Sequence, residues 1–186
     1  MLRKFPVLLI VLMSGFLSAC ADQATETSNS VTYQMASTNP LTATNYAAAD
    51  QLLSALKGKL IPGQSMIVAT VVDINNLDQS STLGRLISEQ LSARFSQAGV
   101  QVIEMKFRES VLMQQSQGEL MLSRNVKDLA NAHDAQAVLV GSYAESRDFV
   151  FVTLKVVQPK TDLVLAVDNY TLPKDKEIMS MLLKTR

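Results

Sequence analysis

The chain has 186 residues, of which 17 are basic and 17 acidic, with one histidine, one cysteine and no tryptophan. A single cysteine excludes an intrachain disulfide, and a neutral charge balance without a block of basic residues argues against nucleic acid as a partner. The length allows one domain with its own hydrophobic core. We therefore expect a packed domain that does not bind nucleic acid.

The N-terminus has the pattern of a bacterial lipoprotein signal. A short positive start, MLRK, precedes the apolar run FPVLLIVLMSGF, which is too short for a membrane-spanning helix. The sequence LSAC, ending at Cys20, resembles the lipobox of bacterial lipoproteins, in which the thiol is the target of modification. The resemblance implies cleavage after Ala19, a diacylglyceryl thioether on Cys20 and acylation of the new amino terminus. Residues 1–19 are thus expected to be a signal peptide, and Cys20 to carry a covalent lipid.

The alternative for Cys20 is an unmodified thiol at the end of a plain signal peptide. If the cysteine is lipidated, each buried methylene contributes about 0.8 kcal/mol, so two or three acyl chains hold the protein to a membrane almost permanently. Ala21 follows the cysteine, where bacteria with a known sorting rule use aspartate to retain lipoproteins in the inner membrane, and Asp22 comes one residue later. We expect the mature protein at the outer membrane, on its periplasmic face.

Residues 20–44 are predicted to be the lipidated cysteine and a flexible tether. After Cys20 the sequence ADQATETSNSVTYQMASTNPLTATN is rich in Ser, Thr, Asn, Gln and Ala and poor in aliphatic residues. A coil of this length has a typical reach of about 25 to 30 Å. The domain is therefore expected to work close to its membrane.

The first half of the globular part alternates helical and strand patterns. YAAADQLLSALKGKL has apolar residues at helical spacing and predicts a helix over about 45–57, and SMIVATVVDI predicts a buried central strand. STLGRLISEQLSARFSQAG predicts a helix between a Ser/Thr cap and Gly99. VQVIEMKF then predicts a strand, and RESVLMQQ a short helix or turn.

The second half ends in long strands. SRNVKDLANAHD predicts a capped helix with Val126, Leu129 and Ala130 inward, and AQAVLVGSYAE a buried strand. DFVFVTLKVVQ and DLVLAVDNYTL predict two long strands joined by the turn PKTD. The order α-β-α-β-α-β-β-β indicates an α/β (α+β) fold, a mixed β-sheet with packed helices. Residues 173–186 form a C-terminal tail, for which a short amphipathic helix and a frayed end are both open.

Two long stretches closely resemble the FlgO family of flagellar outer-membrane lipoproteins. They are VVDINNLDQSSTLGRLISEQLSARFSQAGVQVIEMKFRESVLM and GELMLSRNVKDLANAHDAQAVLVGSYA, and the resemblance covers a globular domain over about residues 45–172. The motifs that carry it are Asp73 at a strand end, Leu83 to Leu86, Glu119 to Arg124 and Ala137 to Tyr143.

The FlgO resemblance implies a non-catalytic part of the envelope structure around the flagellar rod, needed for flagellar stability and motility. The implied fold is similar to the amino-terminal domain of TolB. The implied partners are the outer membrane through the lipid anchor and flagellar basal-body or ring proteins, and a homo-oligomer is a further candidate.

The residues that could carry chemistry have plainer structural interpretations. His133 is the only histidine, at a predicted helix end, so a metal site would lack a second imidazole. Gly84 and Arg85 open a helix after a strand, but without the Lys-Ser/Thr of a phosphate loop. Asp73 and Asp78 lack a third partner, and the serines lack a nucleophile-elbow setting: Ser80, Ser81, Ser123 and Ser142. We expect no enzyme activity, no metal site and no cofactor other than the lipid.

The long strands at 148–172 carry apolar side chains on both faces. Phe149, Phe151 and Thr153 share one face, and Val150, Val152 and Leu154 share the other. Both faces should therefore be covered, either by two helical layers or in part by a subunit contact. The arginines at 85, 94, 108 and 124 are candidates for an interface rim or for ion pairs. Two functions stay open: a structural flagellar lipoprotein, and an envelope lipoprotein of the LpoB type that regulates a peptidoglycan synthase. A tether of about 25 residues favours the first, because an activator that crosses the periplasm needs a longer reach.

Overall fold

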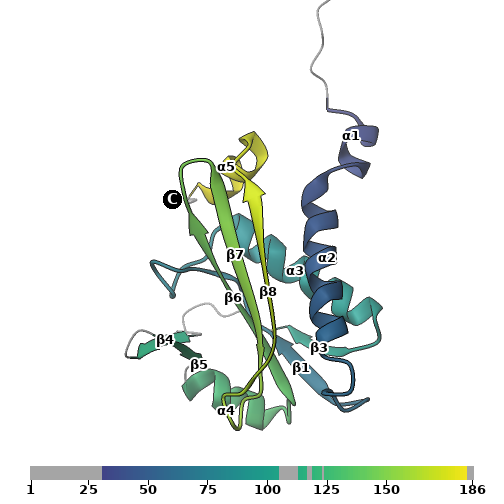
Figure 1. The fold of residues 1–186 in the computed structure, drawn as a ribbon, viewed down its shortest axis with the longest axis vertical. Coiled ribbons are helices and arrows are strands. Elements are labelled where there is room, and N and C mark those ends of the chain that lie inside the picture. The colour runs from purple at the N-terminus through teal and green to yellow at the C-terminus, as the bar shows by residue number, and fades with distance from the viewer. Residues whose placement is uncertain (1–30, 105–112, 117–118, 123, 184–186) are drawn as a thin grey trace, which may run out of the picture.

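The computed structural model of the chain describes residues 31–104, 113–116, 119–122 and 124–183 (Figure 1). Helices and strands follow the predicted α+β alternation, with additional short elements. In chain order they are α1 (Tyr33–Ser37), α2 (Pro40–Ala55), β1 (Ser65–Val68), β2 (Val72–Asp73), α3 (Thr82–Gln97), β3 (Gln101–Glu104), β4 (Met113–Ser116), β5 (Glu119–Leu122), α4 (Arg124–Ala132), β6 (Ala137–Glu145), β7 (Phe149–Val157), β8 (Val164–Pro173) and α5 (Lys176–Leu182).

The main sheet is mixed, as predicted. Its strand order is β3-β1-β6-β7-β8, and β2 also pairs with β6. Strands β3, β1 and β6 are parallel because helices connect them, whereas β6, β7 and β8 form an antiparallel meander. The order places β8 at one edge of the sheet and β3 at the other.

The predicted central strand SMIVATVVDI is interrupted and forms β1 and β2. Both segments run parallel to β6. Between them, the backbone N–H of Val71 donates to the Ser88 hydroxyl of α3 at 2.7 Å instead of joining the sheet. A side chain distant in sequence thus breaks the strand, and the local apolar run does not reveal it.

Helix α2 begins at Pro40 rather than at the predicted residue 45. The Asn39 side chain accepts from the N–H of Leu41 at 2.9 Å, and a proline at the first helical position is preorganised for the helix. Leu41 is buried, so this first turn packs on the domain. Residues 40–44 therefore belong to α2 and not to a flexible tether, while residues 20–30 and Cys20 lie outside the described residues.

The segment RESVLMQQ was predicted as a short helix or turn, and this is wrong for its described part. Met113, Gln114 and Gln115 lie in β4, which pairs antiparallel with β5. The pairing partner, not a local pattern, makes β4 a strand. The earlier residues of that prediction lie outside the described ranges.

The two faces of the sheet are covered unequally (Figure 1). Helices α2, α3 and α5 lie on one face, where Leu52, Ile87 and Leu139 belong to the larger buried core. On the other face a smaller core includes Ala130 of α4 with Val138 and Val140 of β6. Within the described residues, α4 is the only helix in that smaller core, so the rest of the face carries no described helix.

The C-terminal tail contributes to the larger core. Asp175 caps α5 by accepting from the N–H of Ile178 at 2.9 Å, and Ile178 and Leu182 are buried in that core. Of the two alternatives for this tail, the short amphipathic helix is confirmed.

Candidate interaction surface

The side chains of β7 alternate between a buried and an open face. Val150, Val152 and Leu154 are at most 1% exposed, whereas Phe149 and Phe151 are 48% and 49% exposed. Phenylalanine side chains normally gain free energy from burial, so two half-exposed rings on one strand mark a surface suited to contact. A second helical layer over this part of the sheet was one prediction, and it is wrong for the described residues.

The open face continues onto β8. The register places Phe149 opposite Pro173, Phe151 opposite Thr171, Thr153 opposite Asn169, and Lys155 opposite Val167. Val167 is also 48% exposed. We call these outward residues of the two strands the open sheet face; they are Phe149, Phe151, Thr153, Val167, Asn169 and Thr171.

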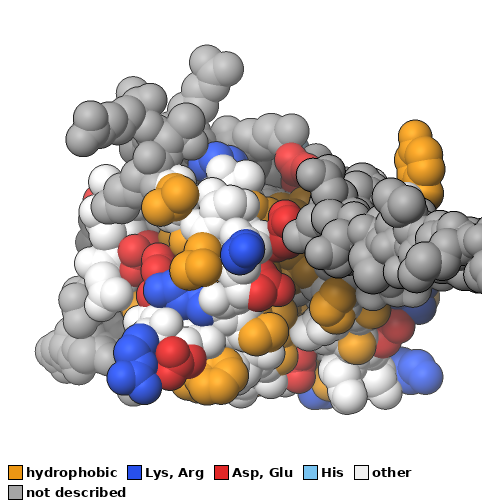
Figure 2. Space-filling view, turned by 90° about the horizontal axis from the view of Figure 1, so that it is seen from above, with side chains coloured by type: hydrophobic (Ala, Val, Ile, Leu, Met, Phe, Trp, Pro, Cys, Tyr) orange, Lys and Arg blue, Asp and Glu red, His pale blue; other side chains and the backbone are white. Residues whose placement is uncertain are grey.

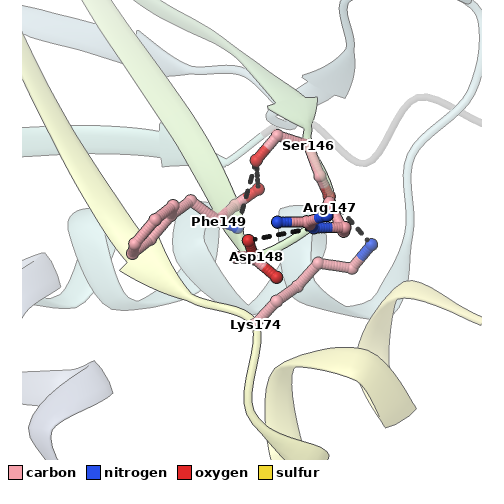
Figure 3. Close-up of polar contacts among 5 residues, drawn as sticks. All are labelled: Ser146, Arg147, Asp148, Phe149 and Lys174. Carbon is pink, nitrogen blue, oxygen red and sulfur yellow. Dashed lines mark hydrogen bonds and ion pairs between the residues drawn. The ribbon is translucent and has the colours of Figure 1, made fainter.

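Hydrogen bonds close the turn between β6 and β7, next to Phe149 (Figure 3). Ser146 accepts through its hydroxyl from the N–H of Phe149 at 3.1 Å, and its own N–H donates to the carbonyl of Phe149 at 2.8 Å. Lys174 donates to the carbonyl of Ser146 at 3.2 Å and pairs with Glu145 at the same distance. The Phe149 ring points away from this polar cluster, so the turn holds an apolar side chain at the surface.

The end of the domain that carries α5 has a mixed surface. In Figure 2, separate hydrophobic side chains lie among both basic and acidic ones, and the charges of the two signs are interspersed. Arg147 and Asp148 of the β6–β7 turn illustrate this, since they form an exposed ion pair at 3.2 Å. A surface of alternating sign does not concentrate an anion or a cation, and it suits contact with protein better than with a nucleic acid.

Behind the open sheet face, a buried polar chain ties β8 to α2 and α3. Asn45 is fully buried; it donates to Gln90 and accepts from the Tyr170 hydroxyl, both at 2.6 Å. Gln90 in turn donates to the Thr42 hydroxyl at 3.0 Å. These bonds fix the strand whose other side forms part of the surface, and the sequence patterns gave no sign of them because the partners lie far apart in the chain.

Of the residues considered for catalysis, the two aspartates lie on the segment between β2 and α3, whereas His133 follows α4. His133 is exposed just after α4, and its backbone N–H completes the helix by donating to Leu129. Asp73 accepts from the N–H of Asn75 at 2.9 Å and so closes a turn, whereas Asp78 is exposed on the same loop. In the described parts of the chain, no group of three or more His, Cys, Asp and Glu residues could hold a metal ion.

Gly84 is explained by packing. A Cβ at this position would lie 2.3 Å from the carbonyl oxygen of Val71, so only glycine lets α3 approach the sheet this closely. Ser81 caps α3 by accepting from the N–H of Gly84 at 3.2 Å, which satisfies a donor that a phosphate would otherwise use. Burial raises the pKa of the neighbouring Tyr143 above its ordinary value.

The remaining serines fit structural roles as far as they are described. The Ser80 hydroxyl donates to the carbonyl of Val71 at 2.6 Å, and Ser142 is buried within β6. Ser123 lies outside the described residues.

The candidate rim arginines differ from one another. Arg94 makes a two-pronged ion pair with Asp50 at 2.8 and 2.9 Å and lies 5.7 Å from the centre of the Tyr46 ring. Arg85 contacts its own helix start, with a bond of 3.1 Å to the Thr82 hydroxyl. Both belong to α3, which packs on the face of the sheet opposite the open sheet face. The side chains of Arg108 and Arg124 lie outside the described part.

Among the described residues, no helix is both long enough and apolar enough to span a membrane. The predicted anchor, Cys20, lies outside the ranges that the structure describes. The open sheet face is therefore the candidate site that the described residues offer.

Of the residues in the open sheet face, Phe149 and Phe151 were predicted from strand alternation. Val167 and Asn169 were missed, although the alternation in DLVLAVDNYTL could have pointed to them.

Solved structures with similar folds come from several bacteria. The C-terminal domain of LpoB from Salmonella enterica is similar over 67% of this chain and 94% of its own, with 12% identity and a TM-score of 0.50. The corresponding domain from Escherichia coli matches over 69% and 96% of the two chains, with 14% identity and a TM-score of 0.46. A PelC dodecamer from Paraburkholderia phytofirmans matches over 61% and 74%, with 15% identity and a TM-score of 0.42. At these identities the likeness to LpoB concerns the fold alone, and it agrees with the mixed α+β sheet.

A family comparison gives a more specific result. No curated protein matches the chain in sequence. The family model described as FlgO protein matches residues 46–177, from α2 to the start of α5, and so covers most of the chain. The resemblance noted in the sequence motifs is thereby confirmed, and the chain belongs to the FlgO family.

Proposed function

We propose that this protein is a non-catalytic outer-membrane lipoprotein that supports the flagellar basal body and motility through protein contacts. The observation that carries the proposal is the open sheet face, where Phe149 and Phe151 remain about half exposed on β7, a strand that is paired on both sides. Family membership supports the flagellar setting, and the structural hydrogen bonds of Asp73, Ser80 and Ser81 support a role without catalysis.

The proposed anchor limits where the domain works. Lipidation at Cys20 would leave about 20 residues before α2 begins at Pro40, and these span at most about 70 Å when fully extended. The short helix α1 reduces this span, because a helix rises only about 1.5 Å per residue. The open sheet face would then meet partners that are themselves close to the outer membrane.

The alternative function is an envelope lipoprotein that regulates a peptidoglycan synthase in the manner of LpoB. The similar fold of the LpoB C-terminal domain is the observation that favours it. The short tether favours the flagellar role, because a regulator acting at the inner membrane must cross the whole periplasm.

Deleting the gene in the native bacterium separates the two functions. The flagellar role predicts cells that swim poorly and show lost or unstable flagella by electron microscopy. Their sensitivity to inhibitors of peptidoglycan synthesis should equal that of wild-type cells. The regulatory role predicts the reverse: normal flagella, and heightened sensitivity to inhibitors of peptidoglycan synthesis. Complementation with the wild-type chain must restore whichever property is lost.

A further inference from the structure

Strand β8 presents a free backbone edge over the middle of its length. Within the described residues it pairs with β7 alone. Two backbone hydrogen bonds of 2.9 Å mark its ends: the N–H of Lys174 donates to the carbonyl of Asp148, and the N–H of Gln158 donates to the carbonyl of Leu163. Because hydrogen-bonded and non-hydrogen-bonded pairs alternate in antiparallel sheets, these bonds fix the pattern between them. The backbone groups of Val167, Asn169 and Thr171 therefore point away from β7.

Both flanks of this free edge are blocked. Near its start, the carbonyl of Leu165 accepts from the side chain of Lys59 at 2.7 Å. At its end, Pro173 has no N–H to offer a new strand. Lysine and proline are common protections of sheet edges, but neither occurs within residues 167–171. The unprotected window is thus five residues long, with the sequence VDNYT.

We infer that this window pairs antiparallel with the same window of a second copy of the chain, with Asn169 on the two-fold axis. In this register Val167 lies opposite Thr171 of the second copy, so β-branched side chains meet on the open sheet face. Asn169 lies opposite itself, where two amides can exchange hydrogen bonds. The outward backbone groups of the two windows can form about six hydrogen bonds.

The charges of the window favour this register over its neighbours. Asp168 is its one charged residue, and centring the axis on Asn169 places it opposite Tyr170 of the second copy. The neighbouring register toward the N-terminus would place the two Asp168 side chains directly opposite each other, and like charges in that position repel. The neighbouring register toward the C-terminus would place Val167 against Pro173, which cannot donate. The axis at Asn169 is the register that avoids both faults.

The paired sheets would also join the two open faces. An axis perpendicular to the sheet keeps both copies of Phe151 and Val167 on one side of the continuous sheet, away from α2 and α3. Phe151 lies beside Thr171 in each copy, and Thr171 would lie beside Val167 of the second copy, so the three side chains would form one row across the joined sheet. The inference does not depend on the flagellar role, because it uses only the edge and its register.

Cysteine cross-linking tests the inferred axis. Cys20 is the only native cysteine, so each variant of the full chain, purified from membranes in detergent, gains one new thiol. Asn169→Cys places two Cα atoms about 5.5 Å apart across the axis, a separation that a disulfide can bridge. We expect mild oxidation to convert most of this variant to a covalent dimer on non-reducing gels. The wild type, treated in the same way, should remain a monomer on these gels.

Thr171→Cys is the matched control, because it lies on the same strand and the same face. In the inferred register its copies are more than 10 Å apart, too far for a disulfide. The pair Val167→Cys and Thr171→Cys, mixed from two separately tagged chains, should cross-link as heterodimers. Equal cross-linking of Thr171→Cys and Asn169→Cys, or none of Asn169→Cys, would overturn the inference.

Light scattering supplies a second measurement that does not need a disulfide. The wild-type chain should show twice its monomer protein mass, and Asn169→Lys should lose the dimer because two ammonium groups would face each other. Ser96→Lys, an exposed change on α3, should remain dimeric. A wild-type monomer, or a dimer that Asn169→Lys leaves intact, would contradict pairing through β8.

Discussion

The Tyr170 hydroxyl donates to the side-chain oxygen of Asn45 across 2.6 Å, and this bond joins the edge strand β8 to α2, the helix that follows the proposed tether. Asn45 has no exposed surface, and its amide group donates to Gln90 of α3. Three elements that are distant in sequence therefore depend on one buried side chain.

Replacing Asn45 with alanine should destabilise the domain markedly. The change leaves the Tyr170 hydroxyl without its acceptor in the interior, where an unsatisfied group costs about 1 to 3 kcal/mol. It also removes the donor to the partly buried side-chain oxygen of Gln90. Tyr170→Phe leaves only the side-chain oxygen of Asn45 without its donor, so it should lower the free energy of unfolding by less than Asn45→Ala does. Urea unfolding of both variants and of the double variant measures the coupling between them. If the two losses simply add, the bond is not the connection described here.

Tyr170 should also make the domain sensitive to alkaline pH. Burial, and to a smaller extent the charge of Asp168, raises the pKa of Tyr170 above its ordinary value. The folded state then holds a proton that the unfolded chain releases, so this stabilisation is complete below about pH 10 and declines as the pH rises from there toward the folded pKa. Unfolding free energies at pH 8 and at pH 10.5 should therefore differ more for the wild type than for Tyr170→Phe. Tyr33→Phe, at a position that is 97% exposed, serves as the control and should behave as the wild type.

Two apolar truncations should have unequal effects on stability. Leu139 is fully buried in the larger core, so Leu139→Ala should cost about 2 to 5 kcal/mol. Phe151 is 49% exposed, so Phe151→Ala should cost only about 1 to 2 kcal/mol, less than a fully buried phenylalanine would. Thermal unfolding of the two variants measures the difference. Equal losses would mean that the open sheet face is covered within the single chain.

The anchor has its own prediction. Cys20→Ser should leave the protein without lipid and mostly unprocessed, because serine cannot form the thioether on which the later steps depend. Labelling cells with a radioactive fatty acid and fractionating their membranes tests this, with Ala21→Ser as a control that keeps the cysteine. Label on the serine variant at residue 20, together with its presence in the outer membrane, would disprove the anchor.

The sequence predicted most long elements of the fold because their signals are local. The stripe of apolar residues and the cap at Ser81 mark α3, and the alternation from Phe149 to Leu154 marks β7. What could not be predicted depends on contacts between distant segments. The break between β1 and β2 needs the Ser88 hydroxyl, and β4 needs its partner β5.

The candidate surface was only half predictable for the same reason. Alternation shows that both faces of β7 are apolar, but it cannot show which face the helices cover. The position of α4 at one end of the sheet leaves Phe149 and Phe151 open, and this follows from the connection between β5 and β6 rather than from β7 itself. Cys20, by contrast, is predicted from sequence alone, since it lies outside the described residues.

The central claim is that the protein works through contacts of the open sheet face and not through bond-making. Its most direct test is swimming by cells whose only copy carries Phe149→Ser with Phe151→Ser, compared with cells carrying His133→Ala, Ser81→Ala or Asp78→Ala, with immunoblots of outer-membrane fractions for every strain. We predict that the double serine variant is present in the membrane at near wild-type level but supports little swimming, while the three polar variants swim normally. Normal swimming with the double serine variant, or lost swimming with a polar variant present at wild-type level, would contradict the claim.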